Sequence, residues 1–331
     1  IVSYLTEELV KMGHEVTLFA SGDSITKARL IPCCTESLRL NKNCEDQLTH
    51  HFIMLEKVIR EMNNFDVIHY HIDYFHFLSS RIYNRVPHLT TLHGRLDIPD
   101  LVPLYREYYE MPVNSISYAQ RNPLSWINWT GNVYHGLPMD LFTPGGGAGD
   151  YLAFLGRVSP EKGVDKAIEI ATQAEMPLKI AAKIDHADKD YFEEKIKHLL
   201  DHPLIEFIGE INEKDKQTFL GEAKALLFPI DWQEPFGLVM IESMACGTPV
   251  IAFNVGSVPE IMEDGKTGFI VSSTSEAVKA LDTLSSIDRL DCRKIFEERF
   301  TADRMAKEYV ALYKSLTNSG VRGRSFELTV A

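Results

Sequence analysis

The chain has 331 residues, of which 45% are hydrophobic, so it exceeds one typical domain and is too apolar to be intrinsically disordered. Its net charge of −13, with no long basic run, argues against nucleic acid or an anionic membrane as the main partner. Five cysteines without zinc-type spacing and the lack of a membrane-spanning apolar run favour a reduced, cytoplasmic setting.

The first half of the chain predicts alternating strands and helices. It opens on an amphipathic helix, Val2–Met12, which leads through Gly13 into a strand at Glu15–Ala20. Because an α/β domain normally begins with a strand and a glycine-rich loop, we expect such a segment to precede this helix in the natural protein. The strands that follow are Val67–His71, Leu89–His93, Ser115–Ser117 and Asn132–His135, and the helices are Leu48–Met62 and Phe75–Tyr83.

The second half repeats the alternation. Its predicted strands are Tyr151–Leu155, Leu178–Ala182, Ile205–Ile208, Ala225–Phe228, Pro249–Phe253 and Gly268–Val271. Its predicted helices are Val164–Ala174, Lys189–Leu200, Glu213–Glu222, Leu238–Cys246 and Glu276–Ser285. Alternation in both halves predicts an α/β fold with two doubly wound, parallel sheets.

A glycine cluster at Pro144–Asp150 separates the halves. A dinucleotide fingerprint would place its glycines between a strand and a helix, whereas these glycines precede a strand, so we interpret them as a flexible hinge. The predicted domains are 1–143 and 144–302. The polar tail 317–331 is predicted to be disordered.

Two glutamates eight residues apart, Glu234 and Glu242, form the most informative pattern. Pro235 and Gly237 mark a helix entry, so one carboxylate precedes the helix and the other lies inside it. Helix N-termini attract phosphate, and carboxylates beside such a site suit the hydroxyls of a sugar joined to that phosphate. The ordinary alternative is two solvated helix carboxylates.

The glutamates and their flanks resemble the E-x7-E motif of bacterial, retaining glycosyltransferases of family four (glycosyl transferases group 1). The flanks are Ala-Leu-Leu-Phe-Pro before the motif, and Cys-Gly-Thr-Pro-Val-Ile-Ala-Phe, Gly-Ser-Val-Pro-Glu-Ile and Asp-Gly-Lys-Thr-Gly-Phe after it. The resemblance extends over nearly the whole chain. It implies the GT-B fold, in which two Rossmann-like domains face each other across a deep cleft and the last helix, here 303–316, returns to the first domain. The chain departs from many relatives at the linker, which reads His135-Gly-Leu-Pro rather than Asn-Gly-Val-Asp.

Arg157 and Lys162 follow the first strand of the second domain, where the planar fork of Arg and the compact charge of Lys would suit a diphosphate. A solvated loop is the alternative. The resemblance implies that both hold the donor diphosphate, that Glu234 contacts the transferred sugar and that Glu242 binds the ribose. It also implies donor contacts from Gly156, from Gly209 and Ile211 beside the nucleobase, and from the amides of Phe236, Gly237 and Leu238.

Histidines mark two strand ends of the first domain. By resemblance, His71 contacts the donor sugar and joins Glu234, Arg157 and Lys162 in catalysis. His93, at a neighbouring strand end, could line the same pocket, whereas His69 is interpreted as a core residue. A metal site at these histidines and His76 is the alternative, but it would need a carboxylate partner and an open site.

The resemblance implies an enzyme that transfers a sugar from a UDP-, GDP- or ADP-sugar to a saccharide, lipid or small-molecule acceptor, with retention of configuration. No metal, pyridoxal phosphate or other cofactor is expected. The alternatives are a sugar-nucleotide 2-epimerase of the same fold and a non-catalytic sugar-nucleotide-binding protein. The sequence does not identify the acceptor or the oligomeric state, and it leaves open peripheral attachment at the inner membrane face.

Overall fold

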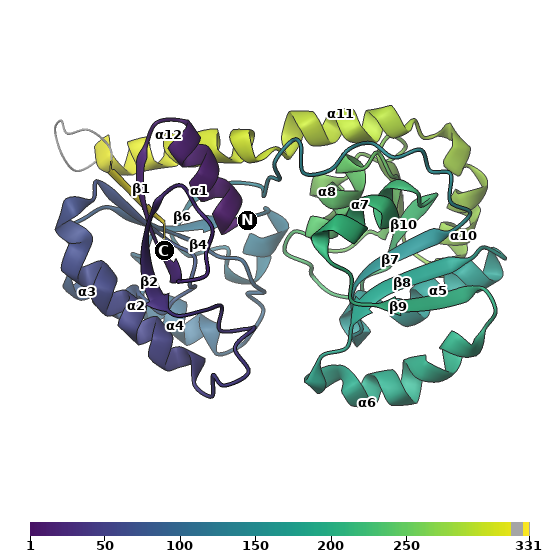
Figure 1. Ribbon diagram of the computed structural model, residues 1–331, viewed down its shortest axis with the longest axis horizontal. Coiled ribbons are helices and arrows are strands. Elements are labelled where there is room, and N and C mark those ends of the chain that lie inside the picture. Colours follow the sequence, from purple (N-terminus) through teal and green to yellow (C-terminus); the bar gives the residue numbers. More distant parts are fainter. Residues whose placement is uncertain (319–326, 331) are drawn as a thin grey trace. The chain divides into compact units, whose positions relative to one another are not determined.

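The structure is a computed structural model that describes residues 1–318 and 327–330. The chain divides into two compact units (Figure 1). The first comprises Ile1–Gly136 and the chain from Ala302 onward, and the second comprises Leu137–Thr301. Each unit is built on its own sheet, in which all strand pairs are parallel.

The sheet of the first unit has the order β2-β1-β13-β3-β4-β5-β6. We expected a further strand from a segment before the first helix. In the structure, the strand between β1 and β3 is β13, from the far end of the chain, which pairs with both. The strands are β1 (Glu15–Ser21), β2 (Arg29–Cys34), β3 (Val67–Tyr70), β4 (His88–Thr91), β5 (Val113–Ser115), β6 (Trp129–Asn132) and β13 (Glu327–Val330).

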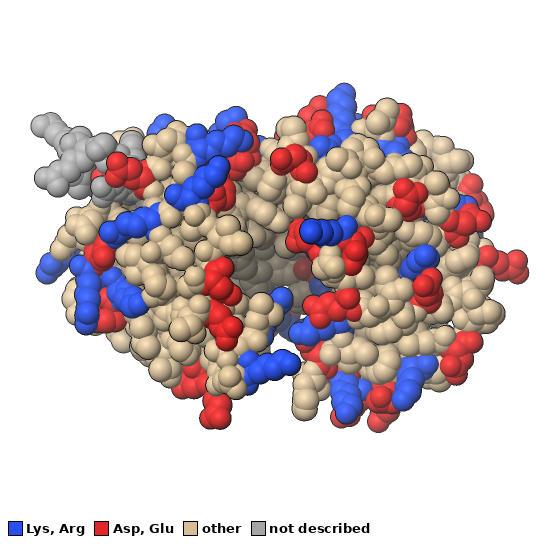
Figure 2. Space-filling model, in the orientation of Figure 1, with Lys and Arg blue, Asp and Glu red and all other residues tan. Residues whose placement is uncertain are grey.

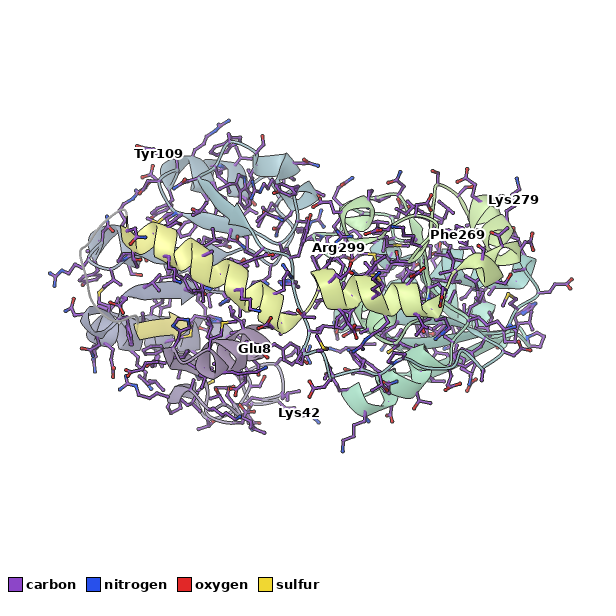
Figure 3. The ribbon with its side chains drawn as sticks, turned by 90° about the horizontal axis from the view of Figure 1, so that it is seen from above. Glu8, Lys42, Tyr109, Phe269, Lys279 and Arg299 are labelled. Atoms are coloured by element: carbon purple, nitrogen blue, oxygen red, sulfur yellow. The ribbon has the colours of Figure 1, made fainter. Side chains whose placement is uncertain are left out.

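Helices cover both faces of this sheet. The helices α1 (Val2–Lys11) and α12 (Ala302–Asn318) lie side by side (Figures 1 and 3). Their buried Leu5, Leu9 and Tyr309 form one core with strand residues. A separate core forms around α2 (Gln47–Glu61). A third contains residues of α3 (Phe77–Ile82) and α4 (Leu101–Glu107).

The sheet of the second unit has the order β12-β11-β10-β7-β8-β9. Its strands are β7 (Leu152–Arg157), β8 (Leu178–Lys183), β9 (Ile205–Gly209), β10 (Ala225–Phe228), β11 (Val250–Phe253) and β12 (Gly268–Val271). Its helices are α5 (Val164–Gln173), α6 (Lys189–Tyr191), α7 (Glu213–Gly221), α8 (Leu238–Ala245), α9 (Val258–Ile261), α10 (Thr274–Asp282) and α11 (Arg289–Arg299).

Successive side chains of a strand point to opposite faces of the sheet, which explains why helices cover both faces of the second sheet. Leu152 and Phe154 of β7 point into a core that also contains α5 and α10 residues, and intervening strand residues point the other way. On the other face, α8 packs against α7 and α11 (Figure 1). Strands buried on both faces read as continuous apolar runs, as Ala225–Phe228 does.

Other elements differ from the predictions in their bounds or were not predicted. Strand β6 begins at Trp129, earlier than the predicted Asn132–His135, and β5 likewise precedes Ser115–Ser117. The predicted helix Lys189–Leu200 is instead a short α-helix followed by π and 3₁₀ turns. Strand β2 and the helices α4, α9 and α11 were not predicted from the sequence. In α11 the apolar signal is weak because only Cys292, Ile295 and Phe296 are buried.

The glycine cluster is bonded into the second unit. Gly145, Gly147 and Gly149 donate their backbone N–H groups to Cys246, Gly221 and Glu222, respectively. The Arg289 guanidinium also donates to the Gly145 carbonyl, at 3.2 Å. The interpretation of this segment as a flexible connector is therefore wrong. The boundary between the units lies earlier, after Gly136.

The predictions for the C-terminal region were partly wrong. The helix predicted at 303–316 is α12, which belongs to the first unit as expected and extends to Asn318. The tail 317–331 was predicted to be disordered, but 317–318 are helical and Glu327–Val330 form β13. The rest of that prediction concerns residues outside those that the structure describes.

We predict that Arg289→Met destabilises the second unit. The guanidinium donates to the carbonyls of Gly145, Gly221 and Ala223 and to the Thr248 hydroxyl. Losing it removes a donor from each of these acceptors, of which the Gly221 carbonyl still accepts from the Gly147 N–H. The expected cost is at least about 2 kcal/mol, because unsatisfied buried acceptors are expensive. The thermal unfolding midpoint should fall by several degrees, whereas Lys294→Met, on the exposed side of the same helix, should leave it unchanged. Equal midpoints for the two variants would contradict this role.

Candidate functional site

The loop after β7 carries two of the predicted donor-binding cations. Gly156 and Arg157 are the last residues of β7, and Lys162 ends the 3₁₀ turn Pro160–Lys162. Gly163 follows with φ of +70°, and a Cβ there would lie 2.2 Å from the Pro229 carbonyl oxygen. Only glycine permits this approach, which brings Lys162 beside the segment that follows β10.

The segment that carries Glu234 is held by the loop after β11. The backbone N–H of Ser257 donates to the Glu234 carbonyl at 3.1 Å, and its hydroxyl donates to the Phe236 carbonyl at 2.9 Å. A Cβ at Gly256 would lie 2.6 Å from the Glu234 nitrogen, so glycine is required here as well. The backbone of Glu234 is therefore held in place independently of the contacts that its side chain makes.

The Glu234 carboxylate binds two donors. Its Oε2 atom forms an ion pair with Lys162 Nζ and accepts a hydrogen bond from Trp232 Nε1 at 3.1 Å. Lys162 Nζ also lies 5.0 Å from the centre of the Trp232 ring. The side chain of Lys162 is 22% exposed and that of Glu234 is 11% exposed, so each charge depends on the other for compensation.

The second glutamate of the motif has a different lysine partner. Glu242 lies in α8 and is buried, and its Oε1 atom accepts a hydrogen bond from Lys216 Nζ of α7 at 2.8 Å. Their side chains are again 22% and 11% exposed. The motif thus presents two carboxylates, each held by its own lysine.

Arg157 is surrounded by acidic side chains. It forms an ion pair with Glu161, and its nitrogens lie 3.3 Å from Asp188 Oδ2 and 3.8 Å from Asp185 Oδ2. Burial raises the pKa of Glu161, but backbone hydrogen bonding and the Arg157 guanidinium outweigh burial and leave this pKa below its usual value. A diphosphate bound by Arg157 would therefore compete with these carboxylates.

The remaining residues predicted to contact the donor lie at strand and helix ends of the same unit. Phe236 is buried, Gly237 is the N-cap of α8, and Leu238 is the first residue of that helix and is exposed. Amide groups in a first helical turn lack partners within the helix and attract anions. Gly209 ends β9, and Ile211 follows it.

The first unit holds the predicted histidines. His69 is fully buried, and its ring nitrogens are hydrogen-bonded to Tyr313 Oη at 2.7 Å and Thr91 Oγ1 at 2.8 Å. This agrees with its interpretation as a core residue. His71 Nδ1 lies 2.8 Å from His93 Nε2, so the two histidines predicted to contact the donor are joined directly.

The environment of these histidines keeps them neutral. Burial lowers the pKa of His71 well below its usual value and lowers that of His93 to about 4. The His135 ring stacks on His93 at 5.2 Å. His71 Nε2 is buried and has no hydrogen-bond partner within the described part of the chain. In residues 1–318 and 327–330, no group of three or more His, Cys, Asp and Glu side chains could hold a metal ion.

Sequence reasoning missed several residues of this site. Trp232 and Lys216 bind the two motif glutamates, and Glu161, Asp185 and Asp188 surround Arg157. Trp232 could have been suspected from its position two residues before Glu234. Lys216 carries no such signal, because it meets Glu242 only through the packing of α7 on α8.

A cavity of about 950 Å³ in the first unit lies away from the predicted residues. Its described lining includes His14, Glu15, Lys27, Arg29 and Asp66, which lie at or near the amino ends of the strands. Parallel sheets of this type bind ligands at the carboxyl ends of their strands, so the cavity lies at the opposite end from the expected site.

The face shown in Figure 2 mixes acidic and basic residues. None of the helices in the described residues is long and apolar enough to span a bilayer.

We predict that acid destabilises the first unit below pH 6.5. Burial is the main cause of the lowered pKa values of His69, His71, His76, His93 and His135. Below a pH of about 6.5 these histidines take up protons in the unfolded chain but not in the folded unit. The free energy of unfolding therefore decreases as the pH decreases.

Each of these histidines contributes up to about 1.4 kcal/mol per pH unit. Thermal unfolding midpoints should therefore decrease between pH 7.5 and pH 5.5. His198→Gln, which changes an exposed residue of the second unit, should retain the full decrease. A midpoint that stays level or rises over this range would contradict the prediction.

Comparisons with known proteins agree with the fold and motif. The family model for glycosyl transferases group 1 matches residues 147–299, and that for glycosyltransferase family 4 matches residues 1–131. An uncharacterized 41.2 kDa protein in the cps region of Klebsiella pneumoniae is 29% identical over 170 residues, which are 50% of this chain and 46% of that protein. The N-acetyl-alpha-D-glucosaminyl L-malate synthase of Bacillus anthracis is 24% identical over 97% of this chain and 94% of its own.

A solved structure also matches the fold. The crystal structure of Anabaena HepE in complex with UDP and glucose has a TM-score of 0.72 and 16% identity, over 92% of this chain and 100% of that one. At this identity the likeness concerns the fold alone. The two family matches cover most of the chain, and the two parallel sheets are those of the GT-B fold. The chain therefore belongs to the group 1, family-four glycosyltransferases.

Proposed function

We propose that this protein transfers a sugar from a nucleotide-diphosphate sugar to an acceptor, with retention of configuration and without a metal ion or other cofactor. The observation that carries the proposal is the contact between Lys162 and Glu234 at the start of α8. A phosphate-binding cation and a hydroxyl-binding carboxylate are thereby placed side by side, as a sugar phosphate requires.

The residue roles are proposed on the family resemblance together with this contact. Lys162, Arg157 and the amides of Phe236, Gly237 and Leu238 bind the diphosphate and stabilise the negative charge that develops as it leaves. Glu234 accepts hydrogen bonds from hydroxyls of the transferred sugar, and Glu242 accepts them from the ribose. Gly156, Gly209 and Ile211 line the nucleotide site. When the donor binds, Lys162 exchanges part of its contact with Glu234 for a phosphate oxygen.

Retention is proposed on the family resemblance together with the separate attachment of the two glutamates. Retaining glycosidases need two carboxylates about 5 Å apart across the scissile bond. Glu234 and Glu242 are instead held by different lysines on different elements, which suits separate roles. We infer front-face displacement, in which the leaving phosphate takes the acceptor proton. Lysine and arginine supply the positive charge that a metal would otherwise supply.

His71 and His93 are proposed to contact the donor sugar. The His71 Nε2 atom is buried and has no partner in the described part of the chain, and an unused polar atom of this kind favours a ligand contact. Because burial keeps both rings neutral, they would act as hydrogen-bonding groups rather than as cations.

Similar proteins support a nucleotide-sugar donor. One structure with this fold was solved in complex with UDP and glucose. The test is a thermal-shift screen of UDP, GDP, ADP and their glucose derivatives. Stabilisation by one nucleotide family is expected, because a ligand well above its dissociation constant raises the unfolding midpoint. No shift with any of them at millimolar concentration would contradict the proposal.

We predict that Glu234→Ala and Lys162→Ala each lower the turnover number at least about tenfold, which corresponds to roughly 1.4 kcal/mol. Each change removes one half of the ion pair and leaves its partner partly buried and uncompensated. Release of the free nucleoside diphosphate measures turnover once a donor is known. Glu298→Gln, an exposed change on α11, is the matched control. Wild-type turnover in both test variants would rule out the assigned site.

A further inference from the structure

The two glutamates of the motif share an arrangement that the sequence does not reveal. Each uses one carboxylate oxygen to bind a lysine: Oε2 of Glu234 binds Lys162, and Oε1 of Glu242 binds Lys216. Lys162 was expected in the site from its position after β7. Lys216 was not expected, because it comes from α7 and lies 26 positions before its partner.

The position of Lys216 is fixed by both ends of α7. Asn212 is the N-cap, and its carbonyl accepts a hydrogen bond from the Lys216 backbone N–H at 3.2 Å. The other end is held by the Thr248 hydroxyl, which donates to the Leu220 carbonyl at 2.7 Å, and by Arg289, which donates to the Gly221 carbonyl at 2.8 Å. The helix therefore presents Lys216 to Glu242 in a defined register.

One carboxylate oxygen of Glu242 has no hydrogen-bond partner among the described residues. Its Oε1 atom is taken by Lys216, whereas no hydrogen bond to Oε2 is found among the described residues. The lysine at 2.8 Å compensates the charge of the carboxylate, whose oxygens accept hydrogen bonds. A ribose offers two adjacent hydroxyl donors, which suit an acceptor of this kind.

We propose that Lys216 is a positioning residue for the nucleotide ribose. It holds the Glu242 carboxylate in an orientation in which the oxygen that Lys216 does not contact accepts a hydrogen bond from the 2′- or 3′-hydroxyl. Lys216 thereby gives the site its preference for ribonucleotides over deoxyribonucleotides. This inference rests on the proposed function, because it takes the ribose to lie at Glu242.

The experiment compares the binding of UDP, 2′-deoxy-UDP and 3′-deoxy-UDP by isothermal titration calorimetry. If the wild type binds GDP or ADP instead of UDP, the same three forms of that nucleotide are used. The variants are Lys216→Met, which keeps the length of the side chain and removes its charge, and Lys216→Arg, which keeps the charge. Lys214→Met changes an exposed lysine of the same helix and is the matched control.

The wild type and Lys214→Met should bind the ribonucleotide at least about tenfold more tightly than one of its deoxy forms, the effect of about 1.4 kcal/mol. Lys216→Met should weaken binding of the ribonucleotide about tenfold and reduce this preference to within about twofold, and Lys216→Arg should restore part of both. In a Glu242→Gln background, Lys216→Met should have no further effect on the preference.

Two results would overturn the inference. One is a Lys216→Met variant that keeps the wild-type preference, and the other is a wild type that binds all three forms equally. Loss of nucleotide affinity with an intact preference would belong to the first result, because Lys216 would then affect binding without acting on the ribose. Failure of the wild type to bind any nucleoside diphosphate would instead overturn the proposed function on which the inference rests.

Discussion

The ion pair between Lys162 and Glu234 is the interaction on which the rest of the site depends. It joins the loop after β7 to the segment between β10 and α8, beyond the carboxyl ends of two paired strands. Both groups are largely removed from water, so neither charge is favourable without the other. Two glycines, Gly163 and Gly256, allow the backbone approaches that bring them together. A substitution that adds a Cβ at either glycine would disturb the site without touching a charged group.

Ion pairs between cations and carboxylates also explain how an acidic protein could bind an acidic ligand. The net charge is −13, yet Lys162, Lys216 and Arg157 all lie in one unit beside carboxylates. Without ligand, these carboxylates compensate the cations locally. A diphosphate bound as proposed would compete with Glu161, Asp185 and Asp188 for Arg157. The affinity for a donor bound in this way would therefore depend on the difference between the ion pairs formed with the diphosphate and the ion pairs within the protein that it replaces. Salt screens the exposed ion pairs of both sets more strongly than the buried ones.

Much of the fold could be predicted because buried parallel strands read as continuous apolar runs. Ala225–Phe228 was predicted with the boundaries that the structure gives, and both sheets follow from the alternation of strands and helices. What could not be predicted depends on contacts distant in sequence. The place of β13 between β1 and β3, and the bonds that hold the glycine cluster, have no local signal.

The same distinction applies to the site. Glu234 and Glu242 stand out because their spacing and flanks resemble a known motif. Lys216 and Trp232 do not stand out, since a lone lysine on a polar helix and a lone tryptophan in a loop are ordinary features. The hydrogen bond from His69 to Tyr313 joins residues 244 positions apart, so burial of His69 could be expected but not its partner.

The most direct test of this account is a crystal structure of the full chain grown with the nucleoside diphosphate that it binds. The account predicts the diphosphate against Lys162 and Arg157, and a ribose hydroxyl within hydrogen-bonding distance of the Glu242 carboxylate. Glu242 should remain bound to Lys216 in that complex. A nucleotide bound elsewhere, or one whose phosphates avoid Lys162, would contradict the account.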